Sequence, residues 1–204
     1  MALQTERREK TRTALLKQAK RLMLRHGYEA TTTQMILEAA GLSKGALYHH
    51  FDSKADMVEA IFEDTSRNAI AAASRHAAGA RSPLVALQKS ALAWLDQIKQ
   101  PVTAQVLFNL GPQAPGWQRA KSIVEATSLA VMTSALEAAV DAGEIALESP
   151  TVTARLLNAL MAEAAYLHLE FGDSTRKEVE RSLAAFLAAL PRPKCRPPRM
   201  SQPR

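Results

Sequence analysis

The sequence contains one cysteine, Cys195, among its 204 residues, which excludes an intramolecular disulfide framework and a four-cysteine zinc site. Glycine is scarce, with 8 residues, and no segment alternates apolar and polar side chains as a half-buried strand does. The longest uncharged stretch, residues 101–118, holds three prolines, two glycines and four amide side chains, which does not suit a membrane span. Charges stand at the N-terminus where a secretion signal would have its apolar run. We therefore expect a soluble, cytoplasmic protein with no membrane partner.

Alanine, leucine, glutamate, lysine and arginine dominate the sequence, and this mixture favours helix over strand. We predict an all-α protein of about nine helices, with a frayed segment over residues 1–6 and a loop over residues 111–116. Four pairs are typical helix starts: Thr31 with Gln34, Ser53 with Asp56, Ser82-Pro83 and Ser149-Pro150. The predicted helices span about 7–26, 32–40, 44–50, 54–76, 83–100, 102–110, 117–142, 150–171 and 174–190.

The positive charge gathers at the two ends of the chain. Residues 1–26 carry eight Lys and Arg against two Glu, and residues 191–204 carry five basic residues and no acid. Residues 57–190 are mildly acidic, with eleven basic and fourteen acidic residues. A basic N-terminal segment suits phosphate binding, although a solvated helix face explains it equally well in isolation. The tail 191–204, with five prolines in fourteen residues, is expected to be disordered.

Residues 31–54, TTTQMILEAAGLSKGALYHHFDSK, predict two short helices joined by a tight turn. A helix about 10–12 Å across fits a B-DNA major groove about 12 Å wide, provided that its first turn does not block the approach. Lys44, Gly45 and Ala46 suit that first turn. Lys44 can donate to guanine, Gly45 lets the backbone come close, and Ala46 can meet a thymine methyl group.

The flanking residues are candidate phosphate contacts, because they combine helix N-termini with hydroxyl, imidazole and ammonium donors. Each of them also has a structural interpretation, since a threonine at a helix start is usually only a cap. Together with the three residues above, the candidate DNA contacts comprise Thr31, Thr33, Gln34, Tyr48, His49, His50 and Lys54.

The segment GYEATTTQMILEAAGLSKGALYHHFDSKADM resembles the DNA-binding segment of the TetR (tetracycline-repressor-like) family of bacterial regulators, and the resemblance covers roughly residues 8–68. It implies a helix-turn-helix domain of three helices and a C-terminal helical bundle that binds a small effector. We expect these domains at 8–68 and 78–190. The resemblance also implies a homodimer formed by the last two helices, and it implies phosphate contacts for Thr33, Tyr48, His50 and Lys54.

The resemblance implies a repressor that binds a palindromic double-stranded DNA operator and is released by a small molecule. Candidate ligand residues are large apolar or hydrogen-bonding side chains of the C-terminal half, and their content favours an apolar or aromatic effector. Ordinary core packing explains each of them as well. The candidates are Trp94, Phe108, Gln113, Trp117, Met132, Met161, Tyr166 and His168.

Several alternatives remain. The apolar stripes over 150–171 and 174–190 explain a packed core as well as a dimer interface. An activator and a protein-binding adaptor also fit a helical protein of this kind. Neither a metal-ligand spacing nor a nucleotide-binding or nucleophile motif is present, so we expect no cofactor, no metal and no enzymatic activity.

Overall fold

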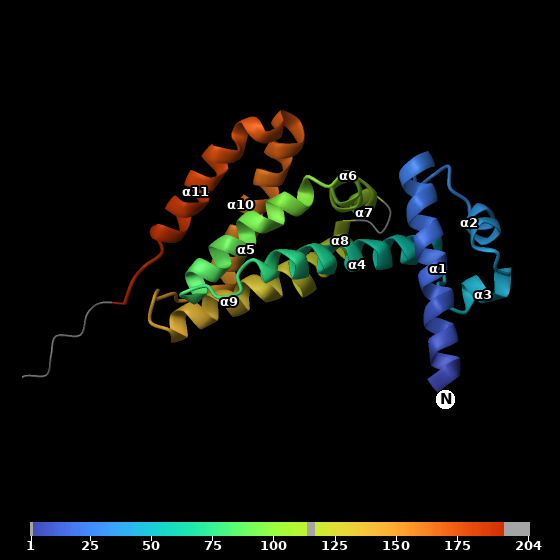
Figure 1. Ribbon diagram of the computed structural model, residues 1–204, viewed down its shortest axis with the longest axis horizontal. Helices are drawn as coiled ribbons and strands as arrows, with labels where there is room; N and C mark the ends of the chain where they lie inside the picture. Colours follow the sequence, from blue (N-terminus) through green and yellow to red (C-terminus); the bar gives the residue numbers. More distant parts are fainter. Residues whose placement is uncertain (1, 114–116, 194–204) are drawn as a thin grey trace, which may run out of the picture.

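The computed structural model describes residues 2–113 and 117–193, and every regular element in those ranges is a helix. The all-α prediction is therefore confirmed for the described residues. The chain forms an elongated molecule in which α4 runs lengthwise from a small N-terminal group of helices into a larger C-terminal bundle (Figure 1). The N-terminal group comprises α1 (Ala2–His26), α2 (Thr33–Ala40), α3 (Lys44–Tyr48) and α4 (Lys54–Arg75).

The first helix corrects the prediction of a frayed N-terminus, because α1 begins at Ala2. Lys10 forms an ion pair with Glu6 one helical turn earlier, at 2.6 Å, and the Thr11 hydroxyl donates to the carbonyl of Arg7. Pairs at this spacing support an exposed helix by a few tenths of a kcal/mol each. The chain therefore extends α1 by more than a turn beyond its buried stripe.

The start of α2 corrects a second prediction. Thr32, and not Thr31, is the N-cap, and its hydroxyl accepts from the backbone N–H of Met35. The amide of Gln34 donates to Glu38 and does not reach back to the cap. Gly27 takes a left-handed conformation at φ 88°, and the following turn carries Thr31 into the interior. The predicted pairs at Ser53, Ser82 and Ser149 do start helices, because each hydroxyl accepts the expected backbone N–H.

The third helix is shorter than predicted, since it ends at Tyr48 and not near His50. The N–H groups of His50 and Phe51 both donate to the carbonyl of Leu47, at 2.9 Å each. This turn directs Phe51, which is 6% exposed, into the core beside Leu47. Burial of the aromatic ring therefore ends the helix.

Two helices of the C-terminal bundle are each interrupted by a π-helical segment, the first by η1 and the second by η2. The helix through η1 continues into Gln113, which corrects the predicted loop from 111, and residues 114–116 lie outside the described ranges. The elements are α5 (Pro83–Ile98), α6 (Pro101–Gln105), η1 (Val106–Leu110), α7 (Gly111–Gln113), α8 (Trp117–Val124), η2 (Glu125–Leu129), α9 (Ala130–Asp141), α10 (Pro150–Phe171), η3 (Gly172–Thr175) and α11 (Arg176–Ala188).

Two buried clusters hold the fold together. The first joins α1 to α4 and includes the predicted stripe of α1, from Leu15 to Met23. It also contains Val106, Leu110, Ala120 and Ile123, which come from η1 and α8 of the C-terminal half. The second cluster joins α5, α9, α10 and α11. Because the first cluster spans both halves, a movement in the C-terminal bundle can reach the N-terminal helices through packed side chains.

One described helix, Arg119–Asp141, is long and apolar enough by length and composition to cross a membrane. In the fold it packs against α4, α5 and α10. It carries Arg119 and Glu125, each of which is paired with an oppositely charged side chain of another helix. We interpret it as a helix of the bundle core.

Candidate DNA interface and core cavity

The first turn of α3 is presented as an open surface. Ser43 caps it, with its hydroxyl accepting from the N–H of Ala46 at 3.4 Å. Lys44 and Gly45 are exposed, Ala46 is half-buried, and Leu47 on the opposite face is 0% exposed. No atom lies within 4 Å of the position that a Cβ on Gly45 would occupy. The helix thus buries its anchor at Leu47 and exposes Lys44 and Gly45, with Ala46 half-buried beside them.

Tyr48 continues this exposed surface. Its side chain is 49% exposed, and the ammonium group of Lys44 lies 5.8 Å from the ring centre. Cation–π contacts at exposed sites contribute about 0.5–1 kcal/mol. The contact holds Lys44 over the outer face of α3 and leaves the Tyr48 hydroxyl at the surface.

Helix α2 contacts α3, and its N-terminus offers a second set of polar groups (Figure 1). Thr32 and Gln34 are exposed and Thr33 is half-buried, so these residues surround the N-terminus of α2. Thr31 does not belong to this surface. Its side chain is 0% exposed and its hydroxyl donates to the carbonyl of Gly27 at 2.7 Å. The prediction of a DNA contact at Thr31 is therefore wrong, and Thr32 is the exposed threonine that the sequence interpretation missed.

Lys54 has a different environment from the one that the sequence suggests. Its ammonium group donates to the carbonyls of Tyr28 and Thr31, at 2.6 and 2.9 Å, and lies 4.1 Å from the centre of the Tyr28 ring. These contacts tie the first residue of α4 to the turn between α1 and α2. Two of the three ammonium protons are used inside the protein, which leaves one for a phosphate.

A group of cations beside α3 was not among the predicted contacts. Arg8 and Arg12 on α1 lie near His50, and the Arg12 guanidinium is 5.6 Å from the centre of the Phe51 ring. Burial lowers the pKa of His50, and repulsion from His49, Arg8 and Arg12 lowers it further, against a smaller opposing effect of Glu9. Among the described residues, neither arginine forms a salt bridge. Basic groups that gather in excess over nearby carboxylates suit a phosphate backbone.

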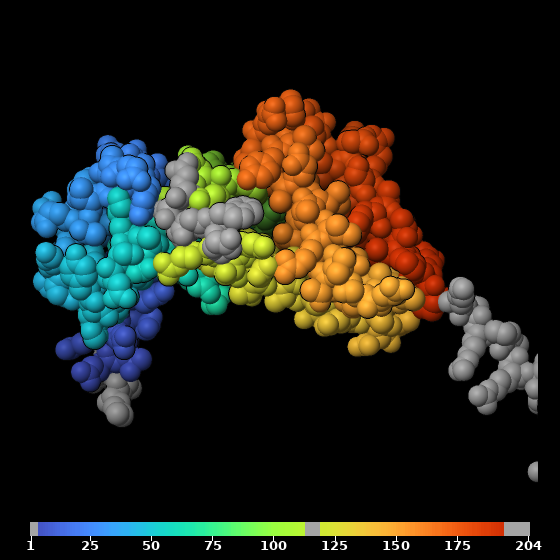
Figure 2. Space-filling view, turned by 180° about the vertical axis from the view of Figure 1, so that it is seen from behind, coloured from blue at the N-terminus to red at the C-terminus, as the bar shows by residue number. Residues whose placement is uncertain are grey.

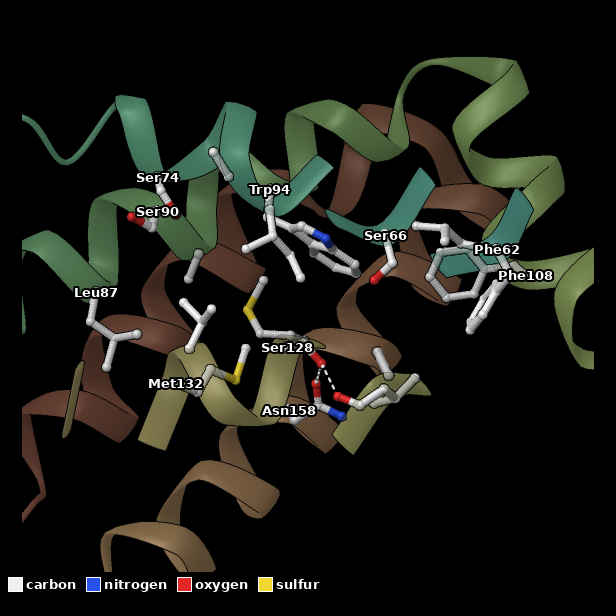
Figure 3. A pocket seen from close by; sticks show the side chains of 18 residues that line it. Phe62, Ser66, Ser74, Leu87, Ser90, Trp94, Phe108, Ser128, Met132 and Asn158 are labelled. Atoms are coloured by element: carbon white, nitrogen blue, oxygen red, sulfur yellow. Dashed lines mark hydrogen bonds between the residues drawn. The ribbon is translucent and has the colours of Figure 1, made fainter. Parts of the chain in front are cut away.

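The C-terminal bundle contains a partly open cavity of about 150 Å³ between α4, α5, η1, α8, η2, α9 and α10. Four of the predicted ligand residues line it, namely Trp94, Phe108, Met132 and Met161 (Figure 3). The cavity is mainly apolar, and the described residues that line it include no ionisable side chain. Besides the indole N–H of Trp94, its polar side-chain groups are four serine hydroxyls and one amide. They belong to Ser66, Ser74, Ser90, Ser128 and Asn158.

Two predicted ligand residues do not line this cavity. Tyr166 is 49% exposed and stacks edge-on against Phe108, with ring centres 5.0 Å apart. His168 is half-buried and its Nδ1 lies 3.8 Å from a carboxylate oxygen of Asp173. The predictions at Gln113 and Trp117 concern side chains outside the described part of the structure. The sequence missed Phe62 and Ser66 on α4 and Asn158 on α10, because only the packing of distant helices brings them together.

Two family models match the chain. Residues 15–61 match the model described as bacterial regulatory proteins of the tetR family, and residues 84–190 match the tetracyclin repressor-like C-terminal domain. The second match alone covers more than half of the sequence.

The chain belongs to the TetR family.

Similar proteins agree with this assignment. The repressor KstR2 of Rhodococcus jostii (strain RHA1) is 52% identical over 50 residues, which are 24% of each chain. The repressor Rv1474c of Mycobacterium tuberculosis is 31% identical over 123 residues, 57% of this chain and 62% of that one. The chain thus matches only part of these relatives' length. The fold also matches that of RolR in complex with resorcinol, with a TM-score of 0.68, 17% identity and coverage of 91% and 90%.

The outer face of α10 in this TetR-family chain exposes large apolar side chains. Leu156 and Val152 are 59% and 56% exposed in the first turns, and Tyr166 and Phe171 are 49% and 53% exposed near the end. The space-filling view shows α10 at the surface of the bundle, beside α11 (Figure 2). The inner face of the same helix, including Leu157 and Met161, is buried in the second cluster. One face of α10 therefore packs the core, and the opposite face remains uncovered in the single chain.

Proposed function

We propose that this protein is a cytoplasmic transcriptional repressor that binds a palindromic DNA operator as a homodimer and is released by a small effector. The observation that carries the proposal is the exposed first turn of α3, Lys44 to Ala46, on a buried anchor at Leu47. The family assignment supports it. The names of the curated relatives, which are transcriptional repressors or regulators, favour repression over activation and regulation over catalysis.

In this proposal Lys44, Gly45 and Ala46 face base edges in the major groove. Phosphates are contacted from both sides of α3, by Thr33 and Gln34 at the start of α2 and by Tyr48, His49 and His50 after it. Lys54 contributes through the one proton that its internal bonds leave free. A dimer places two copies of α3 about 34–36 Å apart, one turn of DNA, so that they contact the two halves of a palindrome.

The exposed apolar side chains of α10 support the homodimer, because a second chain could cover them. Pairing α10 and α11 with the same helices of a second chain would form a four-helix interface and cover those side chains. In this proposal residues 8–68 bind DNA, and residues 78–190 bind the effector and the partner chain. Residues 194–204 of the predicted disordered tail lie outside the described ranges.

The effector occupies the cavity that Trp94, Phe108, Met132 and Met161 line. The neighbouring structure of RolR, in complex with resorcinol, supports a small-molecule effector for this fold. Phe62, Ser66 and Ile70 of α4 also line the cavity, and α4 begins at Lys54, which holds the turn between α1 and α2. An effector that binds one dimer spacing better than the other shifts the dimer toward that spacing, with α4 as the connecting element.

A fluorescence anisotropy titration tests the DNA-binding part of the proposal. The full-length protein is titrated against a labelled duplex from the region upstream of its own gene and against an unrelated duplex of equal length. We expect tighter binding to the upstream duplex, with an affinity that falls steeply as salt rises. Lys44→Ala should weaken binding, whereas Lys89→Ala, the same loss of charge at an exposed position on α5, should not. Equal affinity for both duplexes at modest salt would contradict the proposal.

A further inference from the structure

Asn158 lines the cavity with an amide group whose two protons have no acceptor among the described residues. The Ser128 hydroxyl lies 2.8 Å from Oδ1 of Asn158 and 3.2 Å from the carbonyl of Val124, so these two acceptors share its single proton (Figure 3). Nδ2 of Asn158 has no hydrogen-bond partner among the described residues. The rest of the cavity near it is apolar, including Val124, Met132 and Met161. An amide donor that lines an apolar cavity without a protein acceptor can donate to an oxygen atom of a ligand.

Ser66 provides an acceptor in the same cavity. The Thr127 hydroxyl donates its single proton to the carbonyl of Ile123, at 2.7 Å. The contact of 3.3 Å between the Ser66 and Thr127 hydroxyls therefore has Ser66 as the donor. The lone pairs of Ser66 remain available to accept from a ligand. Thr127 and Ser128 both belong to the π-helical segment η2, so this segment positions the Ser66 and the Asn158 contacts together.

The cavity also limits the charge and size of what it binds. Among the described residues that line it, none is ionisable, so a carboxylate or an ammonium group would enter without a counter-charge. Transfer of an unpaired charge into such surroundings is strongly unfavourable. A volume of about 150 Å³ equals that of cavities known to hold a benzene ring.

We propose that the effector is a neutral molecule about the size of a substituted benzene ring, with a hydroxyl or carbonyl oxygen that accepts from Nδ2 of Asn158. This inference rests on the proposed effector-binding function and names the chemistry of that site. In this proposal Asn158 determines specificity for that oxygen, and Ser66 is a further acceptor in the same cavity. Such a ligand joins α4, which leads to the DNA-binding helices, to α10, which carries the exposed apolar face.

The test compares three probes that share one ring: p-cresol, toluene and benzoate. Calorimetric titration of the full-length protein should give p-cresol an affinity roughly 3- to 10-fold above that of toluene, the usual range for one or two added hydrogen bonds. Benzoate should show no binding in the same range. Equal affinities for p-cresol and toluene, benzoate binding as tight as that of p-cresol, or binding of none of the probes would overturn the inference.

Two variants separate recognition from folding. Asn158→Leu should bind toluene at least as well as the parent and lose the preference for p-cresol, whereas a merely structural role would weaken both probes alike. If that variant does not fold, Ser128→Ala removes the partner that orients the amide and should reduce the same preference. Asn68→Leu, at an exposed position on α4, is the matched control and should keep it. A retained preference in both test variants would overturn the assignment to Asn158.

An anisotropy titration of the same preparations against the upstream duplex distinguishes the two proposals. If the parent protein binds DNA selectively and discriminates none of the probes, the inference on the effector fails and the proposed regulator stands. If it binds p-cresol in preference to toluene without selective DNA binding, the ligand chemistry stands and the regulatory function fails.

Discussion

Gly111 lies so close to the ring of Phe62 that a Cβ atom at position 111 would be 2.2 Å from Cδ2 of that ring. Gly111 follows η1 in the C-terminal bundle, whereas Phe62 lies on α4, lines the cavity and is 4% exposed. The contact thus joins three parts of the molecule at one point: the cavity, helix α4 and the backbone after η1. Only glycine permits this approach.

Gly111→Ala is expected to displace the Phe62 ring, because a buried ring cannot tolerate an atom at that distance. We expect a loss of about 1–3 kcal/mol in the free energy of unfolding, the usual cost of overpacking, together with weaker operator binding. Urea unfolding and anisotropy titration measure the two effects. Adding Phe62→Leu should recover part of both, since leucine vacates the space of the ring. Stability and DNA affinity unchanged in Gly111→Ala would disprove the coupling.

Lys54→Met is expected to act mainly on stability. The ammonium group makes two hydrogen bonds to backbone carbonyls and a cation–π contact with Tyr28, so its removal should cost about 2 kcal/mol in the free energy of unfolding. Lys44→Met provides the comparison, because Lys44 is exposed. That variant should lose DNA affinity with a stability change within about 0.5 kcal/mol. Thermal unfolding measures the stability of both variants. If Lys54→Met is as stable as Lys44→Met, the internal contacts of Lys54 do not stabilise the fold.

The sequence predicted the elements well wherever a local rule decides the outcome. The Ser-Pro pairs at 82–83 and 149–150 start helices, because a hydroxyl cap and a proline act within one turn. The stripe from Leu15 to Met23 is buried, since its spacing leaves a helix one apolar face.

The sequence predictions failed where contacts between distant parts of the chain determine the position of a residue. Thr31 and Thr32 are equivalent caps by local rules, and only the turn after Gly27 buries one and exposes the other. Asn158 is an ordinary helical residue until η2 places Ser128 beside it. The contact of Phe62 with Gly111 likewise exists only in the folded chain. The DNA-reading segment is continuous in sequence and therefore recognisable, whereas the cavity is assembled from seven elements and is not.

Gly45→Ala is expected to separate helix stability from DNA binding. A Cβ at position 45 meets no atom within 4 Å, and alanine is the better helix former, so the variant should be as stable as the parent or up to about 1 kcal/mol more stable. The added methyl group lies on the surface that approaches the DNA. We therefore expect operator affinity to fall while the melting temperature holds or rises. If affinity is also unchanged, the backbone of Gly45 does not approach the groove closely.

DNA binding should strengthen as pH falls through the range in which His50 titrates. In the free protein, burial and then repulsion from His49 and Arg8 lower the pKa of His50, so the imidazole is neutral at pH 7. A nearby phosphate favours the charged form and raises that pKa, so binding takes up a proton between the two pKa values. Anisotropy titrations from about pH 8 to about pH 6 should show the affinity rising by less than tenfold per pH unit.

His50→Gln should reduce this pH dependence. His76→Gln, at the exposed end of α4 and far from α3, is the control and should retain the full dependence. A dependence of the same size in His50→Gln as in the parent would assign the proton to another group, with His49 as the adjacent candidate.

Leu156→Glu tests the proposed dimer. Leu156 is 59% exposed in the isolated chain and lies on the same helix as the exposed Val152 and Tyr166. In a two-fold symmetric interface the substitution adds a charge from each chain to one apolar contact, and removing two unpaired charges from water costs several kcal/mol. Analytical ultracentrifugation should therefore find monomers at concentrations where the parent is dimeric. Operator affinity should fall with it, because a single copy of α3 contacts only half of a palindrome. Leu156→Met, which keeps the side chain apolar, should remain dimeric with unchanged affinity. A dimeric Leu156→Glu variant with full operator affinity would move the interface away from this face of α10.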